Sequence, residues 1–239
     1  MERATVRTGA PLRGVVLSRL HNPSGATVPE EFLKDLARLA ERHDFHVLVD
    51  EVFLDMLPDA VPAHRLSPRL LSTGSLTKVY GFGGLRCGWI IGDGAALQPL
   101  KELSFYLSVD GAASSQATGV RVLERRDEFL ERARAISAAG LGVLEEWVDS
   151  RDDVTWVRPA AGINAFLDLP GVRDVGAFAD GLFEDGVNVA PGAYFGRPGG
   201  VRVSVGGDPT NVRQALLRLG RSLDTCEHGW FRGRADSSG

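Results

Sequence analysis

A lysine and an arginine lie close together in a stretch that is otherwise small or apolar. Residues 75–89 read SLTKVYGFGGLRCGW, with Lys78 and Arg86 on either side of a glycine-rich turn. A lysine amine that is partly removed from water loses its proton readily and can act as a nucleophile, and a guanidinium binds phosphate or carboxylate through a fork of donors. We expect both cations in largely apolar surroundings. The alternative is a strand followed by a surface loop whose two cations are solvated.

The elements that must position these residues alternate between strand and helix. A β-branched run at 14–19 precedes a helical pattern at 26–44, in which Thr27 can cap the first turn and Glu30 can complete a capping box. Alternation of strand and helix favours an α/β sheet with parallel members. Further strands are predicted at 45–53, 70–75 and 86–93.

Long helices and a second, smaller unit are predicted after Gly94. Residues 114–139 have a helical apolar spacing, and the glycines at 140 and 142 are expected to loosen this linking helix. Short strands and two helices then predict a small α+β unit. The strands are expected at 154–159, 163–170, 187–192 and 200–207, and the helices begin near Val175 and Pro209.

This pattern predicts three segments. Residues 1–108 would form part of a large domain, residues 109–224 a linking helix with the small domain, and residues 225–239 a polar tail. Residues 1–13 contain no export signal, and Cys87 and Cys226 provide neither a disulfide framework nor metal-ligand spacing. We therefore expect a soluble, cytoplasmic protein without a metal site. The net charge of −4 and the scattered arginines give no reason to expect a nucleic-acid or membrane partner.

Polar side chains follow three of the predicted strands. Asn22 ends the first strand, Asp50 ends the second, and Ser75 begins the stretch that contains Lys78. Ligands of open α/β sheets bind beyond the carboxyl ends of the strands, so this combination predicts a site for a small aromatic or anionic ligand. Asp50 and its neighbour Glu51 are a poor carboxylate pair for glycoside hydrolysis, because adjacent strand residues point to opposite faces.

Four stretches occur in the order found in one enzyme family. HNPSG, VDEVF, SLTKVYGFGGLRCGW and GGVRVSVGG resemble motifs of the class I/II aminotransferases, which are pyridoxal-phosphate-dependent enzymes of fold type I. The resemblance extends from about Gly14 to Asp224. It implies the C-terminal part of that fold, with a partial, mostly parallel sheet of the large domain and a small α+β C-terminal domain.

The resemblance implies a role for each residue that could bind the coenzyme, pyridoxal 5′-phosphate. Lys78 would bond covalently to the coenzyme aldehyde and later carry a proton, and a partly desolvated setting would suit both tasks. Arg86 and Ser75 would hold the phosphate. Asp50 would pair with the pyridine nitrogen, and Asn22 would donate to the ring oxygen.

Two further positions follow from the same resemblance. Arg202 would grip the α-carboxylate of the substrate with two parallel hydrogen bonds. Phe53 stands where the family usually has a tyrosine that donates to the ring oxygen of the coenzyme, so that hydrogen bond is absent here. Thr77 replaces the usual second serine of the lysine motif, which is a mild change.

The implied reaction is amino transfer between an amino acid and a 2-oxo acid, in a homodimer if the protein is complete. A lyase or decarboxylase on the same coenzyme is the alternative, and an inactive relic or partner-binding fragment is a third. The family has a long N-terminal half that supplies further strands and part of the coenzyme site. Only thirteen residues precede the first recognisable strand. We therefore expect this chain alone not to be a competent transaminase.

Overall fold

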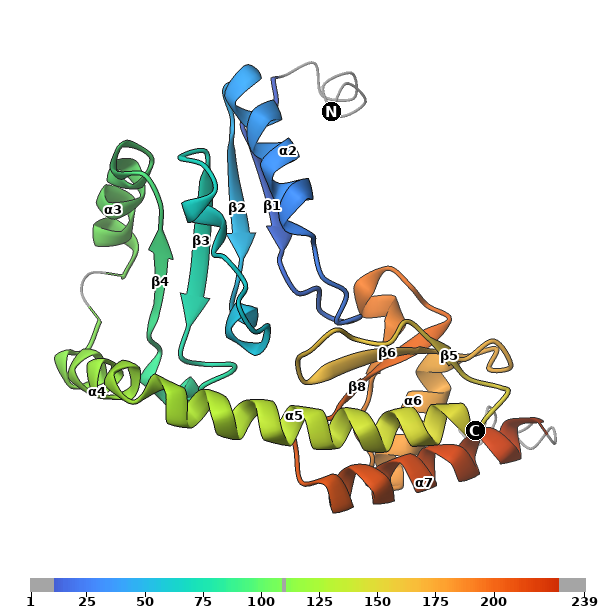
Figure 1. The fold of residues 1–239 in the computed structure, drawn as a ribbon. Helices are drawn as coiled ribbons and strands as arrows, with labels where there is room; N and C mark the ends of the chain where they lie inside the picture. Colours follow the sequence, from blue (N-terminus) through green and yellow to red (C-terminus); the bar gives the residue numbers. More distant parts are fainter. Residues whose placement is uncertain (1–10, 109–110, 228–239) are drawn as a thin grey trace, which may run out of the picture. The chain divides into compact units, whose positions relative to one another are not determined.

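The computed structural model describes residues 11–108 and 111–227 (Figure 1). The chain divides into two compact units, each with its own sheet and apolar core. The first unit contains residues 27–133 and the segment before Asn22, and the second contains residues 22–26 and the segment from Arg134 onward. The division falls after Ala133, whereas the large-domain segment predicted from the sequence ends at residue 108. Within the described ranges, none of the helices is long and apolar enough to cross a bilayer.

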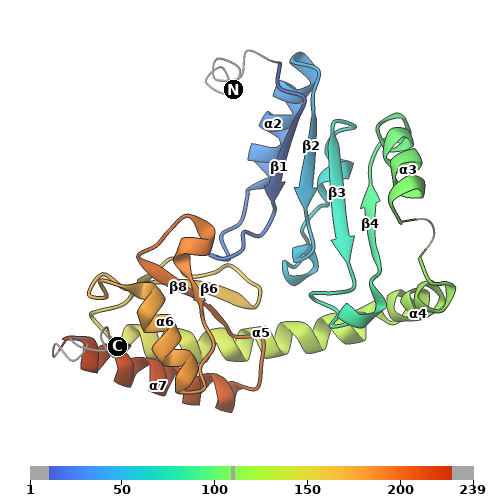
Figure 2. The same ribbon diagram turned by 180° about the vertical axis from the view of Figure 1, so that it is seen from behind.

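The sheet of the first unit has four strands in the order β1-β2-β3-β4. The first three strands are parallel and β4 is antiparallel to β3, which confirms the predicted mostly parallel sheet. Figure 2 shows the same strands from behind, with β4 at the edge of the sheet beside β3. The strands are β1 (Gly14–Ser18), β2 (His46–Asp50), β3 (Leu70–Ser75) and β4 (Gly88–Ile91).

Helix α2 (Glu30–Arg42) covers one face of β1 and β2, and its predicted cap is wrong. The helix begins after Pro29, whose extended backbone sets the entry, and no side chain caps its first turn. Thr27 instead pairs with Leu20 in an isolated bridge, two residues before Pro29. Glu30 binds Lys34 one turn along at 2.7 Å.

Three helices follow β4, and the single linking helix predicted over 114–139 is wrong. One helix ends at Glu124, with Arg125 as its C-cap. The next helix begins at Arg126 and continues through Gly140 and Gly142 without interruption. A Cβ built on Gly140 would lie 2.1 Å from the Val205 carbonyl oxygen. That glycine therefore permits a close approach between backbones and does not end the helix. The helices are α3 (Gly94–Ser108), α4 (Ala113–Glu124) and α5 (Arg126–Asp149).

The second unit confirms the predicted small α+β arrangement. Its strands pair antiparallel in the order β5-β6-β8-β7, and their buried side chains form one core with those of α5, α6 and α7. Helix α7 continues to Glu227, so the first residues of the predicted polar tail are helical. The elements are β5 (Thr155–Trp156), β6 (Asn164–Asp168), α6 (Val175–Glu184), β7 (Ala190–Pro191), β8 (Gly200–Ser204) and α7 (Pro209–Glu227).

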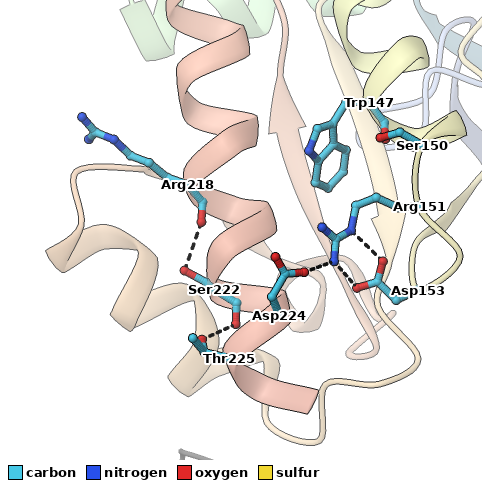
Figure 3. A network of polar contacts seen from close by, with 8 residues as sticks. All are labelled: Trp147, Ser150, Arg151, Asp153, Arg218, Ser222, Asp224 and Thr225. Carbon is cyan, nitrogen blue, oxygen red and sulfur yellow. Dashed lines mark hydrogen bonds and ion pairs between the residues drawn. The ribbon is translucent and has the colours of Figure 1, made fainter. Parts of the chain in front are cut away.

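A half-buried arginine joins the ends of α5 and α7 (Figure 3). Arg151 donates to both carboxylate oxygens of Asp153 at 2.6 and 2.7 Å and to Asp224 at 2.7 Å. Its guanidinium lies 5.6 Å from the centre of a Trp147 ring. The hydrogen bonds from Arg151 lower the pKa of the Asp153 carboxyl. This cluster fixes the C-terminal end of α7 against the loop that precedes β5.

Candidate functional site

Two predicted site residues end neighbouring parallel strands. Asp50 is the last residue of β2 and Ser75 is the last residue of β3, as the sequence predicts. Asp50 pairs in register with Thr73, and side chains of residues two apart on a strand point to the same face. Asp50 and Ser75 therefore lie on one face of the sheet, at its carboxyl edge.

The connection from β3 to β4 carries Lys78 and Arg86. Ser75 pairs with Gly88, and the Leu76 amide donates to the Cys87 carbonyl at 3.1 Å, so the loop is closed at its base. The Ser75 hydroxyl accepts from the Thr77 amide at 2.9 Å, which orders the turn just before the lysine. Ser75 ends β3, and Lys78 and Arg86 lie in the closed loop that follows it at the carboxyl edge of the sheet, where β2 ends at Asp50.

The expected apolar surroundings of the two cations are not found, because Lys78 and Arg86 are both exposed. The reason is that the loop extends past the carboxyl edge of the sheet, where no described residue of the first unit buries these two side chains. Arg86 follows a short 3₁₀ turn (Gly83–Leu85) and adopts a left-handed backbone with φ of 52°. A non-glycine residue in this conformation is uncommon and is found disproportionately at functional positions.

Phe53 lies three residues after Asp50, the last residue of β2, and the two residues differ in exposure. One Asp50 carboxylate oxygen accepts from the Val52 amide at 3.1 Å, which fixes the turn that follows the strand. Phe53 is buried at the start of the 3₁₀ turn Leu54–Met56. The predicted contact of Phe53 with a coenzyme ring stays a prediction.

The second unit brings Asn22 and Arg202 together. Arg202 lies on β8, and its Nη1 donates to the side-chain oxygen of Asn22 at 3.1 Å. Its guanidinium carbon lies 5.2 Å from the centre of the Phe195 ring, at a distance suited to a cation–π contact. Asn22 does not end β1 as predicted. It lies in a turn four residues after Ser18, because β1 is shorter than the apolar run suggests.

A cavity of about 240 Å³ lies in the first unit against β3 and β4. Its lining includes Glu51, Ser72 and Trp89, and Ser75 is the only predicted site residue among the residues that line it. The Glu51 carboxylate is buried and accepts from the Ala63 amide at 2.9 Å. Burial raises the pKa of the Glu51 carboxyl. Ser72 and Glu51 belong to the face opposite Asp50, and Asp50, Lys78 and Arg86 do not line the cavity.

A hydrogen bond that the sequence analysis missed anchors the Lys78 loop. The Tyr80 hydroxyl donates to Asp55 at 2.7 Å, and Arg126 donates to the same carboxylate at 3.3 Å. Burial, and then the hydrogen bond to Asp55, raise the pKa of Tyr80. Tyr80 and Asp55 are 25 residues apart, and no local pattern connects them. The sequence therefore contains no signal for this contact.

Comparison with known proteins identifies the family of this chain. The model of the family described as aminotransferase class I and II matches residues 4–219. An aspartate/prephenate aminotransferase of Thermus thermophilus is 28% identical over 218 residues, covering 88% of this chain and 56% of that protein. An arginine–pyruvate transaminase of Pseudomonas aeruginosa is 28% identical over 220 residues, covering 87% of this chain and 55% of the relative.

Solved structures agree in fold. A PLP-dependent aminotransferase from Streptococcus suis has a TM-score of 0.87 at 22% identity, with all of this chain and 62% of the other covered. The aspartate aminotransferase of Thermus thermophilus with maleate has a TM-score of 0.82 at 28% identity, covering 92% of this chain and 59% of the other. The chain spans little more than half the length of the curated relatives it matches. It belongs to the aminotransferase class I and II family and has the corresponding part of the fold-type-I architecture.

Proposed function

We propose that this chain is part of a pyridoxal-phosphate-dependent aminotransferase, which transfers an amino group between an amino acid and a 2-oxo acid. The observation that carries the proposal is the convergence of Asp50, Ser75, Lys78 and Arg86 at one edge of the first sheet. Membership of the aminotransferase family supports the same reaction. The proposal concerns the whole protein, and its reaction is inferred from the relatives, because this chain spans little more than half of their length.

The donor set of the first unit fits the coenzyme chemically. A guanidinium and a hydroxyl suit a phosphate, a carboxylate suits a protonated pyridine nitrogen, and a primary amine suits an aldehyde. Arg86 and Ser75 supply the first two groups, Asp50 supplies the carboxylate and Lys78 supplies the amine. Bound pyridoxal phosphate would supply an electron-withdrawing ring that stabilises negative charge at the substrate Cα.

The residues of this chain would then have distinct tasks. Arg86 and Ser75 would hold the phosphate, and the Asp50 carboxylate would keep a proton on the pyridine nitrogen. The Lys78 Nζ would take a proton from the substrate Cα and return it to the neighbouring coenzyme carbon. Asn22 would donate to the ring oxygen of the coenzyme.

Arg202 would fix the substrate by its α-carboxylate. The Asn22 side chain and the Phe195 ring already restrict the guanidinium, so little freedom would be lost on binding. A fixed carboxylate determines which Cα bond lies perpendicular to the coenzyme ring. Orientation of this kind, and not the lysine alone, decides between amino transfer and other reactions at Cα.

A lyase or decarboxylase on the same coenzyme is the second candidate. One relative, 26% identical over 226 residues, is a capreomycidine synthase of Streptomyces vinaceus. Proteins that are not named as aminotransferases therefore also match this chain. Dependence of turnover on a 2-oxo acid would distinguish the two candidates. Amino transfer requires that acceptor, and elimination or decarboxylation does not.

Selective labelling of Lys78 tests the proposed role of that residue. The chain has three lysines, Lys34, Lys78 and Lys101. Hydrogen bonds to Glu30 and then Glu31 raise the pKa of Lys34, which makes its amine less nucleophilic at neutral pH. If Arg86 and Ser75 hold the phosphate beside Lys78, incubation of the 239-residue chain with pyridoxal phosphate followed by borohydride should attach a pyridoxyl group mainly to Lys78. Peptide mass mapping measures the distribution of label.

The controls are matched lysine variants. Lys78→Ala should lose most of the label, and Lys101→Ala, which alters an exposed residue of α3, should retain it. A label spread evenly over the three lysines would contradict the assignment of Lys78. The test does not require turnover and can therefore be made on the chain alone.

A further inference from the structure

Arg202 is held by neutral groups. Its Nη1 donates to the Asn22 side-chain oxygen at 3.1 Å, and its guanidinium carbon lies 5.2 Å from the centre of the Phe195 ring. Among the described residues, Arg202 takes part in no ion pair with a carboxylate (N···O within 4.0 Å). A guanidinium without such an ion pair can bind the carboxylate of a ligand without first breaking a bond to a carboxylate of the protein.

A carboxylate of the protein nevertheless lies nearby on the same face of the sheet. Strands β6 and β8 lie side by side (Figure 1). Arg202 on β8 pairs with Phe166 on β6, and Asp168 pairs with Gly200. Asp168 is thus the diagonal neighbour of Arg202, at a spacing of about 7–8 Å that long side chains can bridge. The core side chains of the unit, such as Leu167, point to the other face.

Arg197 forms an ion pair with the Asp168 carboxylate. Its Nε and Nη2 donate to the two oxygens of Asp168 at 2.8 and 2.6 Å, and its guanidinium lies 5.6 Å from the centre of the Phe166 ring. The side chain of Arg197 is 66% exposed and that of Asp168 is 26% exposed. An exposed ion pair contributes little to stability, but a two-pronged pair with a ring beneath it has a well-defined direction.

We propose that Arg197 is a positioning residue, which keeps the Arg202 guanidinium available for a ligand carboxylate by holding Asp168. The inference rests on the proposed role of Arg202 in binding the α-carboxylate of an amino or 2-oxo acid. Without Arg197, the charge of Asp168 is no longer compensated and its side chain is free to turn along the sheet toward Arg202. The protein carboxylate then competes with the carboxylate of the ligand.

The first experiment needs no ligand. The Nε–Hε signal of Arg202, assigned by its loss in Arg202→Gln, is followed by NMR on the 239-residue chain from pH 6 to pH 3. In Arg197→Gln the pH-dependent step in the chemical shift of this signal should be at least about twice the wild-type step, because Asp168 now faces Arg202 and carboxyl groups titrate in this range. This step should disappear in the double variant Asp168→Asn/Arg197→Gln.

The double variant separates competition from structural damage. If Arg197 only stabilised the fold, removing its partner as well would not restore the behaviour of Arg202. A step no larger than in the wild type, or one that persists in the double variant, would overturn the proposal.

The second experiment measures carboxylate binding with propionate, which has neither an amine nor an oxo group. The response of the Arg202 signal to propionate should be roughly two- to fivefold weaker in Arg197→Gln, which is the range of a single exposed charge pair, and should recover in the double variant. Arg158→Gln is the matched control. Arg158 forms a similar two-pronged pair with Glu145 in the same unit, and its loss should leave the response unchanged.

The outcomes distinguish the two proposals. If propionate does not change the Arg202 signal of the wild type, the carboxylate-binding role of Arg202 is overturned, and this inference with it. Equal responses in the wild type and Arg197→Gln would overturn the inference about Arg197 alone.

Discussion

Glu51 is a buried carboxylate one residue beyond Asp50, and its surroundings oppose its charge. It accepts from the Ala63 amide at 2.9 Å, and the buried Arg19 lies close enough to favour the ionised form. Burial outweighs these contributions, so the pKa of Glu51 is raised in the folded chain. The Nε and Nη1 atoms of Arg19 have no hydrogen-bond partner among the described residues. Ionisation of Glu51 therefore lowers the stability of the first unit.

The pH dependence of Glu51→Gln tests this balance. Because the folded pKa is above the unfolded value of about 4.3, the folded state binds more protons between the two values. The contribution of Glu51 to stability is fully present below the unfolded pKa and is lost as the pH rises through the folded pKa. Glutamine does not ionise, so the variant should gain stability relative to the wild type as the pH rises from 4 to 7.

Urea unfolding of both proteins at several pH values measures the difference. A variant that loses stability relative to the wild type over this range would indicate that the attraction of Arg19 outweighs burial. The sequence could predict that Asp50 and Glu51 point to opposite faces, because they are adjacent on one strand. It could not predict the burial of Glu51, which depends on the loop that folds over it.

Helix α5 shows that a long-range packing contact can override the helix propensity of a residue. Glycine lowers helix propensity, so the sequence predicts that Gly140 and Gly142 loosen the helix. The helix instead continues to Asp149, and Gly140 lies where a side chain would meet the Val205 carbonyl. The strands could be predicted, because their apolar runs are local. The contact of Gly140 joins residues 65 positions apart in the sequence, which no window can reveal.

Substitution of the two glycines by alanine should give opposite results. Gly140→Ala would place a Cβ 2.1 Å from the Val205 carbonyl oxygen, and backbone must shift to relieve the overlap. We expect a destabilisation of about 1–3 kcal/mol, as for other overpacked sites. A Cβ on Gly142 meets nothing within 4 Å, so Gly142→Ala should stabilise the helix by roughly 0.5–1 kcal/mol. Thermal or urea unfolding of the two variants provides the measurement, and equal effects would contradict the packing role of Gly140.

At the scale of the whole molecule, the first unit exposes apolar surface that sheets of this kind usually cover. Val16 is 74% exposed and Ile90 is 44% exposed, and the register places both on the face of Asp50. Helix α3 has no buried residue, and its Tyr106 is 84% exposed. Parallel sheets are normally covered on both faces, and exposed apolar patches favour association. The motifs could be predicted from the sequence because each is local. The exposure of Lys78, by contrast, depends on what covers the sheet.

We expect the 239-residue chain, prepared alone, to self-associate through the first unit. The double variant Leu103→Glu/Tyr106→Glu places two charges on one face of α3, where the wild-type side chains are 52% and 84% exposed, and should reduce the apparent mass at equal concentration. The matched control is Val157→Glu/Tyr194→Glu, which removes two side chains of 69% and 79% exposure from the second unit and adds the same charge. Light scattering after size-exclusion chromatography over a range of concentrations measures the mass, and circular dichroism checks that both variants keep their helices. A wild-type mass equal to that of one chain at all concentrations would contradict self-association, and an equal reduction by both variants would indicate that added charge, and not the apolar surface of α3, controls it.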